Sequence, residues 1–395
     1  MDASAMSDEG STWSDRPLPI GVLFSQTGVT ASVERTQLLA TRLAISEINA
    51  AGGVAGRELV EVGEDCQANP KLFRQEAIRL LDEQGVRLIF GCYMSSTRKA
   101  VLPVIESRNA LLIYPTLYEG FEYSPNCIYT GPTPNQNSQP LARFILENHG
   151  PRILLIGSNY IFPYESNRIF SDLVTEARGK ILDEIYVPLD PSPADFDRTL
   201  SQIRRFAPDA VFSTIVGSGT AMFYEAYRRA GFDPARTPIA SLTTNEAEVA
   251  EMSAEAAEGH FTAAPYFETL ATARNRSFLA AYRRLFGPDI PVTAAAEAAY
   301  FQVHLVAAAV AQARSLDRAR IVEALARVEF DAPQGMVAID PTNNHTFLWP
   351  RVARLNAAKR FEIVWDPHRR MKPDPYFVSS APDDWSLGHQ PAKID

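Results

Sequence analysis

The chain has 395 residues and a formal charge of −9, from 38 Lys and Arg against 47 Asp and Glu. This length suits two domains, and a hydrophobic content of 46% excludes wholesale disorder. The acidic balance, without a basic stripe, argues against a nucleic-acid binder. Three scattered cysteines are too few for a disulfide framework or a zinc site. No apolar run approaches the roughly 18–20 residues of a membrane span, and we expect no cofactor or metal.

The first sixteen residues are polar and acidic. They lack both the basic n-region and the apolar h-region that a secretory signal needs. We therefore expect a disordered tail over residues 1–16 and a cytoplasmic protein. A periplasmic location is the alternative if an export signal has been removed.

Strands and helices alternate from the start of the chain. A strand predicted over 19–25 precedes a helix over 33–49, whose apolar residues recur at helical spacing. The Ala51-Gly52-Gly53 stretch ends that helix, as glycine commonly does. Further strands are predicted over 58–62, 86–90, 111–114, 153–156, 185–187, 210–215 and 238–242, with helices beginning near residues 71, 97, 138, 165, 197, 220 and 246.

This alternation, with apolar strands buried on both faces, predicts doubly wound parallel α/β sheets. The Gly- and Pro-rich stretch 129–135 separates two series of strands, which indicates two lobes. Three later helices, over 272–286, 293–313 and 317–328, come without strong strands, and the tail from 341 mixes short β-like runs with proline and charge. We expect an N-terminal lobe of residues 17–131 plus 264–338 and a C-terminal lobe of residues 132–263 plus 339–395.

Ligands of open α/β sheets bind at the carboxyl ends of the strands. The loops predicted there carry hydroxyls, tyrosines and backbone amides, which suit a small neutral ligand with hydrogen-bonding groups. Ser96, Thr220 and Asn245 can equally be helix caps, but capping does not explain tyrosines at several strand ends. The loops are residues 91–97, 115–120, 157–163, 216–220 and 243–246.

Catalytic patterns are weak. Cys92, Lys99 and Glu106 loosely resemble a Cys–Lys–Glu amidase set, but Cys92 follows an apolar strand, which favours a buried, inert thiol. The six histidines show no metal-ligand spacing, and no serine lies in a Gly-x-Ser-x-Gly motif. The stretch 217–220 lacks the Gly-Lys-Ser/Thr of a phosphate loop. We expect no enzyme.

Three sequence blocks resemble the amide-sensing negative regulators of aliphatic amidase expression (the AmiC family). They are similar, less closely, to the urea- and short-amide-binding proteins of ABC transporters. The resemblance covers essentially the whole chain after about residue 17, and includes a Tyr-Pro-Thr-x-Tyr-Glu-Gly motif and a Pro-Asn-Gln-Asn motif. The blocks are residues 91–101, 114–126 and 131–138.

The resemblance implies a type I periplasmic-binding-protein fold, in which two α/β lobes are joined by three hinge crossings and the ligand lies between them. Leu117 stands where the family has proline, Phe162 where it has tyrosine, and Ala295 where it has tryptophan, which implies a roomier or less polar pocket. By resemblance the ligand-binding residues are Tyr93, Ser95, Tyr114, Thr116, Leu117, Tyr160 and Phe162.

Three functions follow as hypotheses. The first is a non-enzymatic cytoplasmic sensor that binds a short aliphatic amide or urea and regulates amidase expression through an AmiR-type RNA-binding antiterminator. It would contact neither nucleic acid nor membrane itself, and homo-oligomerisation is left open. The second is the solute-binding receptor of a urea, amide or branched-chain amino-acid ABC transporter. The third is an amidohydrolase that uses Cys92.

Overall fold

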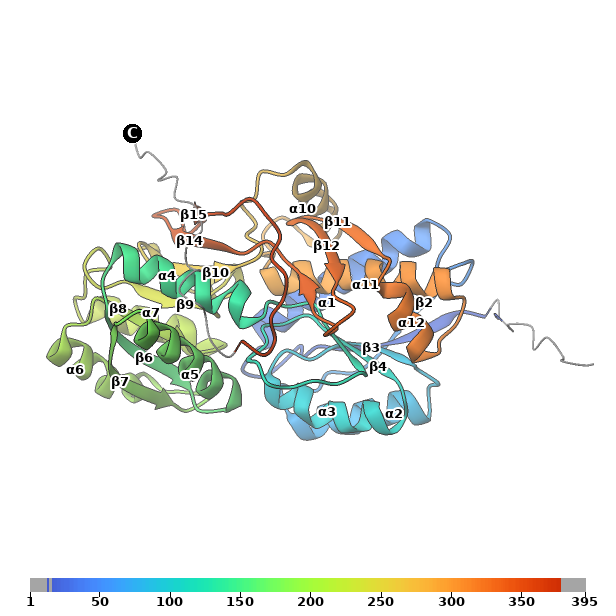
Figure 1. Ribbon diagram of the computed structural model, residues 1–395, viewed down its shortest axis with the longest axis horizontal. Helices are drawn as coiled ribbons and strands as arrows, with labels where there is room; N and C mark the ends of the chain where they lie inside the picture. The colour runs from blue at the N-terminus through green and yellow to red at the C-terminus, as the bar shows by residue number, and fades with distance from the viewer. Residues whose placement is uncertain (1–12, 14–15, 378–395) are drawn as a thin grey trace, which may run out of the picture.

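The computed structural model describes residue 13 and residues 16–377, which form two α/β lobes lying side by side (Figure 1). The predicted disordered tail lies outside the described residues, apart from Trp13 and Arg16, and so does the end of the chain after residue 377. The expected organisation into two α/β lobes, each built on its own sheet, is confirmed.

The first lobe is built on a parallel sheet in the order β2-β1-β3-β4-β5. Its inner strands are short apolar runs whose residues are buried throughout, because helices cover both faces. Helices α2 (Pro70–Asp82) and α3 (Ser95–Ser107) cover one face, and α1 (Ala31–Ala50) covers the other (Figure 1). The strands are β1 (Leu18–Leu23), β2 (Leu59–Val62), β3 (Leu88–Gly91), β4 (Leu111–Tyr114) and β5 (Cys127–Tyr129), the last of which the sequence analysis missed.

The second lobe is built on a seven-stranded sheet in the order β15-β14-β10-β9-β8-β6-β7. Five of its strands pair in parallel, as predicted, while the pairings of β10 with β14 and of β14 with β15 are antiparallel and were not predicted. The short turn between β14 and β15 makes them a hairpin at the sheet edge, and a hairpin is necessarily antiparallel. The strands are β6 (Arg152–Ser158), β7 (Lys180–Val187), β8 (Ala210–Thr214), β9 (Ile239–Ser241), β10 (Phe261–Ala264), β14 (Arg351–Leu355) and β15 (Phe361–Trp365).

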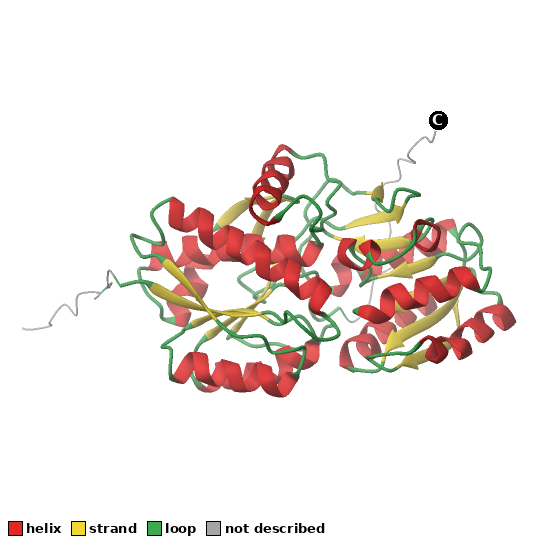
Figure 2. Cartoon of the chain, turned by 180° about the vertical axis from the view of Figure 1, so that it is seen from behind, coloured by secondary structure: helices red, strands yellow, loops and turns green. Residues whose placement is uncertain are grey.

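Among the described residues, six α-helices belong to the second lobe. Helices lie on both faces of its sheet (Figure 2). Two of them, α5 and α7, begin at loops that follow β6 and β8 and face the first lobe. The helices are α4 (Ser138–Asn148), α5 (Ile161–Glu176), α6 (Asp197–Phe206), α7 (Ser218–Arg229), α8 (Glu246–Ala250) and α9 (Ala254–Ala257).

The chain crosses between the lobes three times: after β5, after β10 and before β14. Between the last two crossings, helices α10 (Ala273–Phe286), α11 (Ala294–Ala313) and α12 (Arg318–Leu325) pack on the first lobe. A small antiparallel sheet follows, with strands β11 (Glu329–Ala332), β12 (Gly335–Ile339) and β13 (Thr346–Phe347). Residues 340–349, which the prediction assigned to the C-terminal lobe, pair with β12 and with Tyr129 of β5.

The sequence analysis expected no apolar run as long as a membrane span, and helix α11 corrects that expectation. It is the one helix among the described residues that is long and apolar enough to cross a membrane by length and composition alone. Most of its side chains are buried inside the protein, where they pack against α1 and α12 in the core of the first lobe. Its apolar character is therefore explained by its position as the central core helix.

Candidate ligand-binding site

A cavity of about 520 Å³, counting the space open to solvent at its mouth, lies between the two lobes. It is bounded by the carboxyl ends of β4, β5, β9 and β10 and by the first turn of α11, so it lies where the fold places ligands. The first lobe contributes Val33, Tyr93, Pro115, Thr116, Leu117, Thr130, Gly131, Pro132, Thr293, Ala294, Ala295 and Ala298; the second contributes Leu242, Thr243, Thr244, Asn245, Thr262, Ala263, Ala264 and Pro265.

Two backbone segments touch at the wall of the cavity, on the side of the first crossing. A Cβ atom on Gly131 would lie 2.0 Å from the carbonyl oxygen of Thr116. Only glycine therefore allows the crossing after β5 to run against the loop that follows β4. This contact places Thr116 and Thr130 in the same wall.

Three threonine hydroxyls in the cavity wall donate their protons to other groups of the protein. Thr130 Oγ1 donates to Gln302 Oε1 at 2.9 Å, and Thr243 Oγ1 donates to the Ile215 carbonyl at 2.6 Å. Thr116 Oγ1 donates to the Cys92 carbonyl across a longer 3.4 Å. A hydroxyl has one proton and two lone pairs. Thr116 Oγ1 already accepts from Gln37 Nε2 at 3.2 Å, and Thr243 Oγ1 lies 3.2 Å from Ser241 Oγ. Each of the three oxygens therefore keeps at least one lone pair that can accept a hydrogen bond from a ligand.

Two other hydroxyls in the wall keep their protons free. Thr262 Oγ1, from the second lobe, is buried and has no hydrogen-bond partner among the described residues. The Tyr93 hydroxyl, from the first lobe, makes no hydrogen bond to any described residue either, and burial raises its pKa well above the usual range, so it stays protonated. The wall thus has one hydroxyl donor without a partner from each lobe.

The cavity wall carries no charged side chain among the described residues. The nearby carboxyl group of Glu248 is occupied by the protein itself, since it accepts from Gly217 N at 3.0 Å, Thr220 Oγ1 at 3.2 Å and Asn245 Nδ2 at 3.1 Å. Burial raises the pKa of Glu248 well above its usual range, which favours the neutral acid. The site thus offers hydroxyls and hydrocarbon, without a fixed charge.

The seven residues predicted to bind ligand lie in and around this cavity. Tyr93, Thr116 and Leu117 line it. Ser95 and Tyr114 contact the protein instead: Ser95 Oγ donates to Glu119 Oε2 at 2.7 Å, and Tyr114 Oη donates to the Tyr93 carbonyl at 2.8 Å.

The last two predicted residues, Tyr160 and Phe162, come from the second lobe, with ring centroids 6.3 Å apart. Tyr160 packs in an apolar cluster with Tyr93 and Met94 of the first lobe, so it lies where the lobes meet. Phe162 is buried at the first turn of α5. Whether these seven residues contact a ligand stays a prediction.

The sequence analysis missed several residues of the wall, Thr262 above all. Thr262 belongs to β10, a strand that was not predicted, so no strand-end rule drew attention to it. Thr130 lay in the stretch interpreted as a linker. Residues 243–245 were recognised as a strand-end loop, and Asn245 does cap α8, because its Oδ1 accepts from Ala247 N.

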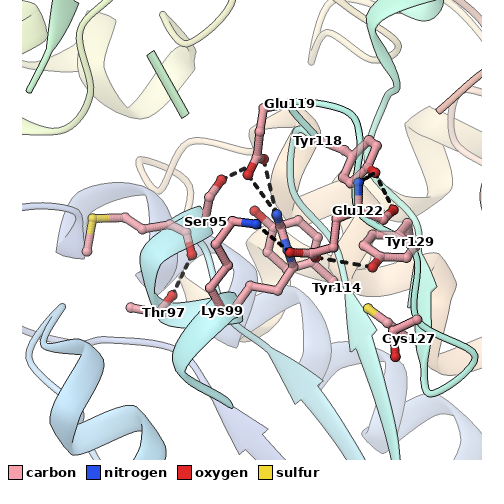
Figure 3. A network of polar contacts seen from close by, with 12 residues as sticks. Ser95, Thr97, Lys99, Tyr114, Tyr118, Glu119, Glu122, Cys127 and Tyr129 are labelled. Carbon is pink, nitrogen blue, oxygen red and sulfur yellow. Dashed lines mark hydrogen bonds and ion pairs between the residues drawn. The ribbon is translucent and has the colours of Figure 1, made fainter. Parts of the chain in front are cut away.

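A buried polar network lies beside the site (Figure 3). The Arg98 side chain, 0% exposed, donates to Glu119 Oε1 at 2.8 Å and to Glu122 Oε1 at 2.7 Å. Its guanidinium carbon lies 4.7 Å from the centroid of the Tyr114 ring. Lys99 Nζ completes the network from the surface, 2.6 Å from the second oxygen of Glu122. Two cations thus face two carboxylates.

The proposed Cys–Lys–Glu set is not assembled. Cys92 is fully buried, and burial raises the pKa of its thiol well above the usual range, so the reactive thiolate is disfavoured. Lys99 pairs with Glu122, and Glu106 accepts from Ser124 Oγ at 2.7 Å. Within the described ranges, no group of three His, Cys, Asp or Glu side chains could hold a metal ion.

The chain is similar to known binding proteins along most of its length. A family model described as a periplasmic binding protein domain matches residues 18–382. The chain is 25% identical to a Leu/Ile/Val-binding protein homolog of Brucella suis, over 74% of this chain and 77% of the relative. It is 22% identical to a leucine-, isoleucine-, valine-, threonine- and alanine-binding protein of Pseudomonas aeruginosa, over 80% and 83% of the two chains.

Solved structures share the fold. A solute-binding protein of an ABC transporter from Rhodopseudomonas palustris, in complex with 3,4-dihydroxybenzoic acid, superposes with a TM-score of 0.80 at 22% identity over 88% of this chain and 95% of its own. A branched-chain amino-acid transporter substrate-binding protein from Streptococcus pneumoniae, in complex with isoleucine, gives a TM-score of 0.78 at 20% identity over 90% and 100%. The chain belongs to the type I periplasmic binding protein family of solute-binding proteins.

Proposed function

We propose that this protein is a receptor for a small neutral amide, either a short aliphatic amide or urea, which it binds between its lobes without catalysing a reaction. The observation that carries this proposal is the hydrogen-bonding character of the uncharged cavity wall. The hydroxyls of Tyr93 and Thr262 are free to donate, and those of Thr116, Thr130 and Thr243 are left to accept.

An amide matches this arrangement on both sides of its functional group. Its carbonyl oxygen accepts from the free hydroxyls, and its NH₂ group donates to the threonine oxygens. The alkyl end meets the hydrocarbon of Leu117, Leu242 and Ala295. In a site closed to water, each of these hydrogen bonds contributes more than it would in solution.

The ligands of the relatives fit this wall less well. An amino acid such as isoleucine carries an ammonium and a carboxylate, and burying either charge without a partner is costly. A benzoate has no N–H group for the threonine oxygens, and the wall provides no cation for its carboxylate. The chemistry of the wall therefore supports an amide over both.

Replacing Thr262 with valine is expected to weaken amide binding by about 1–2 kcal/mol, or roughly 5–30-fold, because the ligand oxygen loses a buried donor. The measurement is calorimetric titration with acetamide, propionamide, butyramide, urea and leucine. The same samples are assayed for ammonia, whose release would contradict a non-enzymatic receptor.

Thr199→Val provides the matched control. Thr199 Oγ1 is also buried without a partner, but it lies on α6, away from the cavity. The control should bind amides like the wild type. If Thr262→Val binds equally well, Thr262 is not a ligand donor. Saturable binding of leucine with no response to amides or urea would overturn the proposed function.

A second candidate is a cytoplasmic sensor of the AmiC type that controls amidase expression through an antiterminator. The observation that favours it is the resemblance of the Tyr-Pro-Thr-Leu-Tyr-Glu-Gly block, residues 114–120, to that family. Fractionation of cells that make the native full-length protein tests this candidate. Co-purification with periplasmic markers would contradict it and support a transporter receptor.

A further inference from the structure

The loop that follows β4 contacts the ligand cavity at one end and the second lobe at the other. It begins with Thr116 and Leu117, which line the cavity. Further along, Phe121 N donates to the Pro375 carbonyl at 3.2 Å, and the guanidinium carbon of Arg168, on α5 of the second lobe, lies 4.9 Å from the centroid of the Phe121 ring. A shift of this loop would therefore change both the cavity wall and the contact with the second lobe.

Glu119, halfway along the loop, is its most deeply buried attachment to α3. The side chain is 2% exposed, and both of its oxygens are used. Oε1 accepts from Arg98 Nη2 at 2.8 Å, and Oε2 accepts from Ser95 Oγ at 2.7 Å and from Arg98 Nη1 at 3.3 Å (Figure 3). Because Arg98 is itself buried, this attachment is a charge-assisted pair in a dry environment, where such contacts are strong.

Glu122 also accepts from Arg98, but in a different setting. Its carboxylate is partly exposed and is shared with the surface residue Lys99. The Glu122 side chain makes no hydrogen bond with Ser95, and Glu122 follows Phe121, farther along the chain from the cavity wall. Replacing either glutamate removes a charged partner of the buried arginine, but only replacing Glu119 also removes the bond to Ser95 near the cavity wall. Comparing the two variants therefore distinguishes a loss of stability from a loss of this attachment.

We propose that Glu119 is a positioning residue for ligand binding: by fastening its loop to Ser95 and Arg98, it holds Thr116 and Leu117 at the cavity and Phe121 against the second lobe. The proposal rests on the proposed function, because it assigns Glu119 to the same amide site. It also gives the Ser95 hydroxyl a defined task, since its proton is used to hold the loop.

The test compares Glu119→Gln with the matched control Glu122→Gln, because each removes one charged partner of Arg98. Both variants should melt at a lower temperature than the wild type. Only Glu119→Gln should bind propionamide more weakly, by about tenfold, as expected when a neutral amide turns its NH₂ towards the arginine and loosens the loop. Equal affinities of the two variants for propionamide would overturn the proposal.

A double-mutant cycle with Thr116→Val distinguishes positioning from general destabilisation. If Glu119 acts by placing Thr116, the loss of affinity caused by Glu119→Gln should be smaller in the Thr116→Val background. If the losses of affinity from the two substitutions simply add, Glu119 does not act through the placement of Thr116. The wild type is titrated first: if it binds neither amides nor urea, the proposed function fails.

Hydrogen exchange tests the positioning role without any ligand. The amides of residues 117–121 should exchange faster in Glu119→Gln than in Glu122→Gln. Unchanged exchange in this loop would overturn the proposal, whatever the ligand proves to be.

Discussion

Replacing Arg98 with methionine is expected to lower the free energy of unfolding by about 3–5 kcal/mol, the largest effect expected of any single substitution considered. The stability falls because the substitution leaves two carboxylates and an aromatic ring without their cationic partner. Glu119 is 2% exposed and Glu122 is 15% exposed, and both carboxylates lose their buried cationic partner. The ring of Tyr114 loses its cation contact as well.

Urea denaturation followed by circular dichroism measures this loss. Lys99→Met is the matched control, because Lys99 pairs with the same Glu122 from a side chain that is 43% exposed, and exposed pairs contribute little. Adding Glu119→Gln and Glu122→Gln to Arg98→Met should restore part of the stability, since the uncompensated charges are then gone. An Arg98→Met protein as stable as the control would show that this network does not stabilise the first lobe.

Replacing Gly217 with alanine is expected to abolish most ligand binding. Gly217 adopts φ +62° and ψ −144°, and a Cβ atom there would lie 2.0 Å from the carbonyl oxygen of Val29 in the other lobe. The next residue, Ser218, donates its backbone N–H to the same oxygen at 3.3 Å. An added methyl group would therefore hold the lobes apart, and we expect amide affinity to fall by more than about tenfold, because the donors of the two lobes no longer meet at one ligand.

Gly231→Ala is the control for this substitution. Gly231 follows the other end of α7, has φ +79°, and has no atom within 4 Å of an added Cβ, so alanine there brings the backbone strain without the contact between lobes. Titration with propionamide gives the affinity, and small-angle scattering gives the separation of the lobes. A Gly217→Ala protein that binds like Gly231→Ala, with the same radius of gyration, would contradict the role of this contact.

The sequence predicted those parts of the fold whose signal is local. The strand β4 and the helix α11 both appear within a residue or two of their expected bounds, because a short apolar run and a long helical period are unambiguous. The strand β10 was missed, and β14 and β15 were predicted only as short β-like runs in the tail, without bounds. β10 and β14 pair with each other across about 90 residues of chain, so their place in the second sheet decides their conformation more than local pattern does.

The candidate site was predictable to a similar extent. Strand-end loops and family resemblance pointed to Tyr93 and Thr116, which both line the cavity. Neither route could indicate that Ser95 donates to Glu119 or that Thr262 lacks a partner. Both depend on which side chains come into contact in the folded protein, and a single sequence does not show those contacts.

The central claim is that the cavity binds a neutral amide, and the most direct test is titration of the wild type with propionamide and with propionate. The two molecules have nearly the same shape, but propionate has no N–H group and carries a charge. The account predicts saturable binding of propionamide and none of propionate at the same concentrations. Binding of propionate with no response to propionamide would contradict it, because the threonine oxygens and the uncharged wall would then not select the ligand.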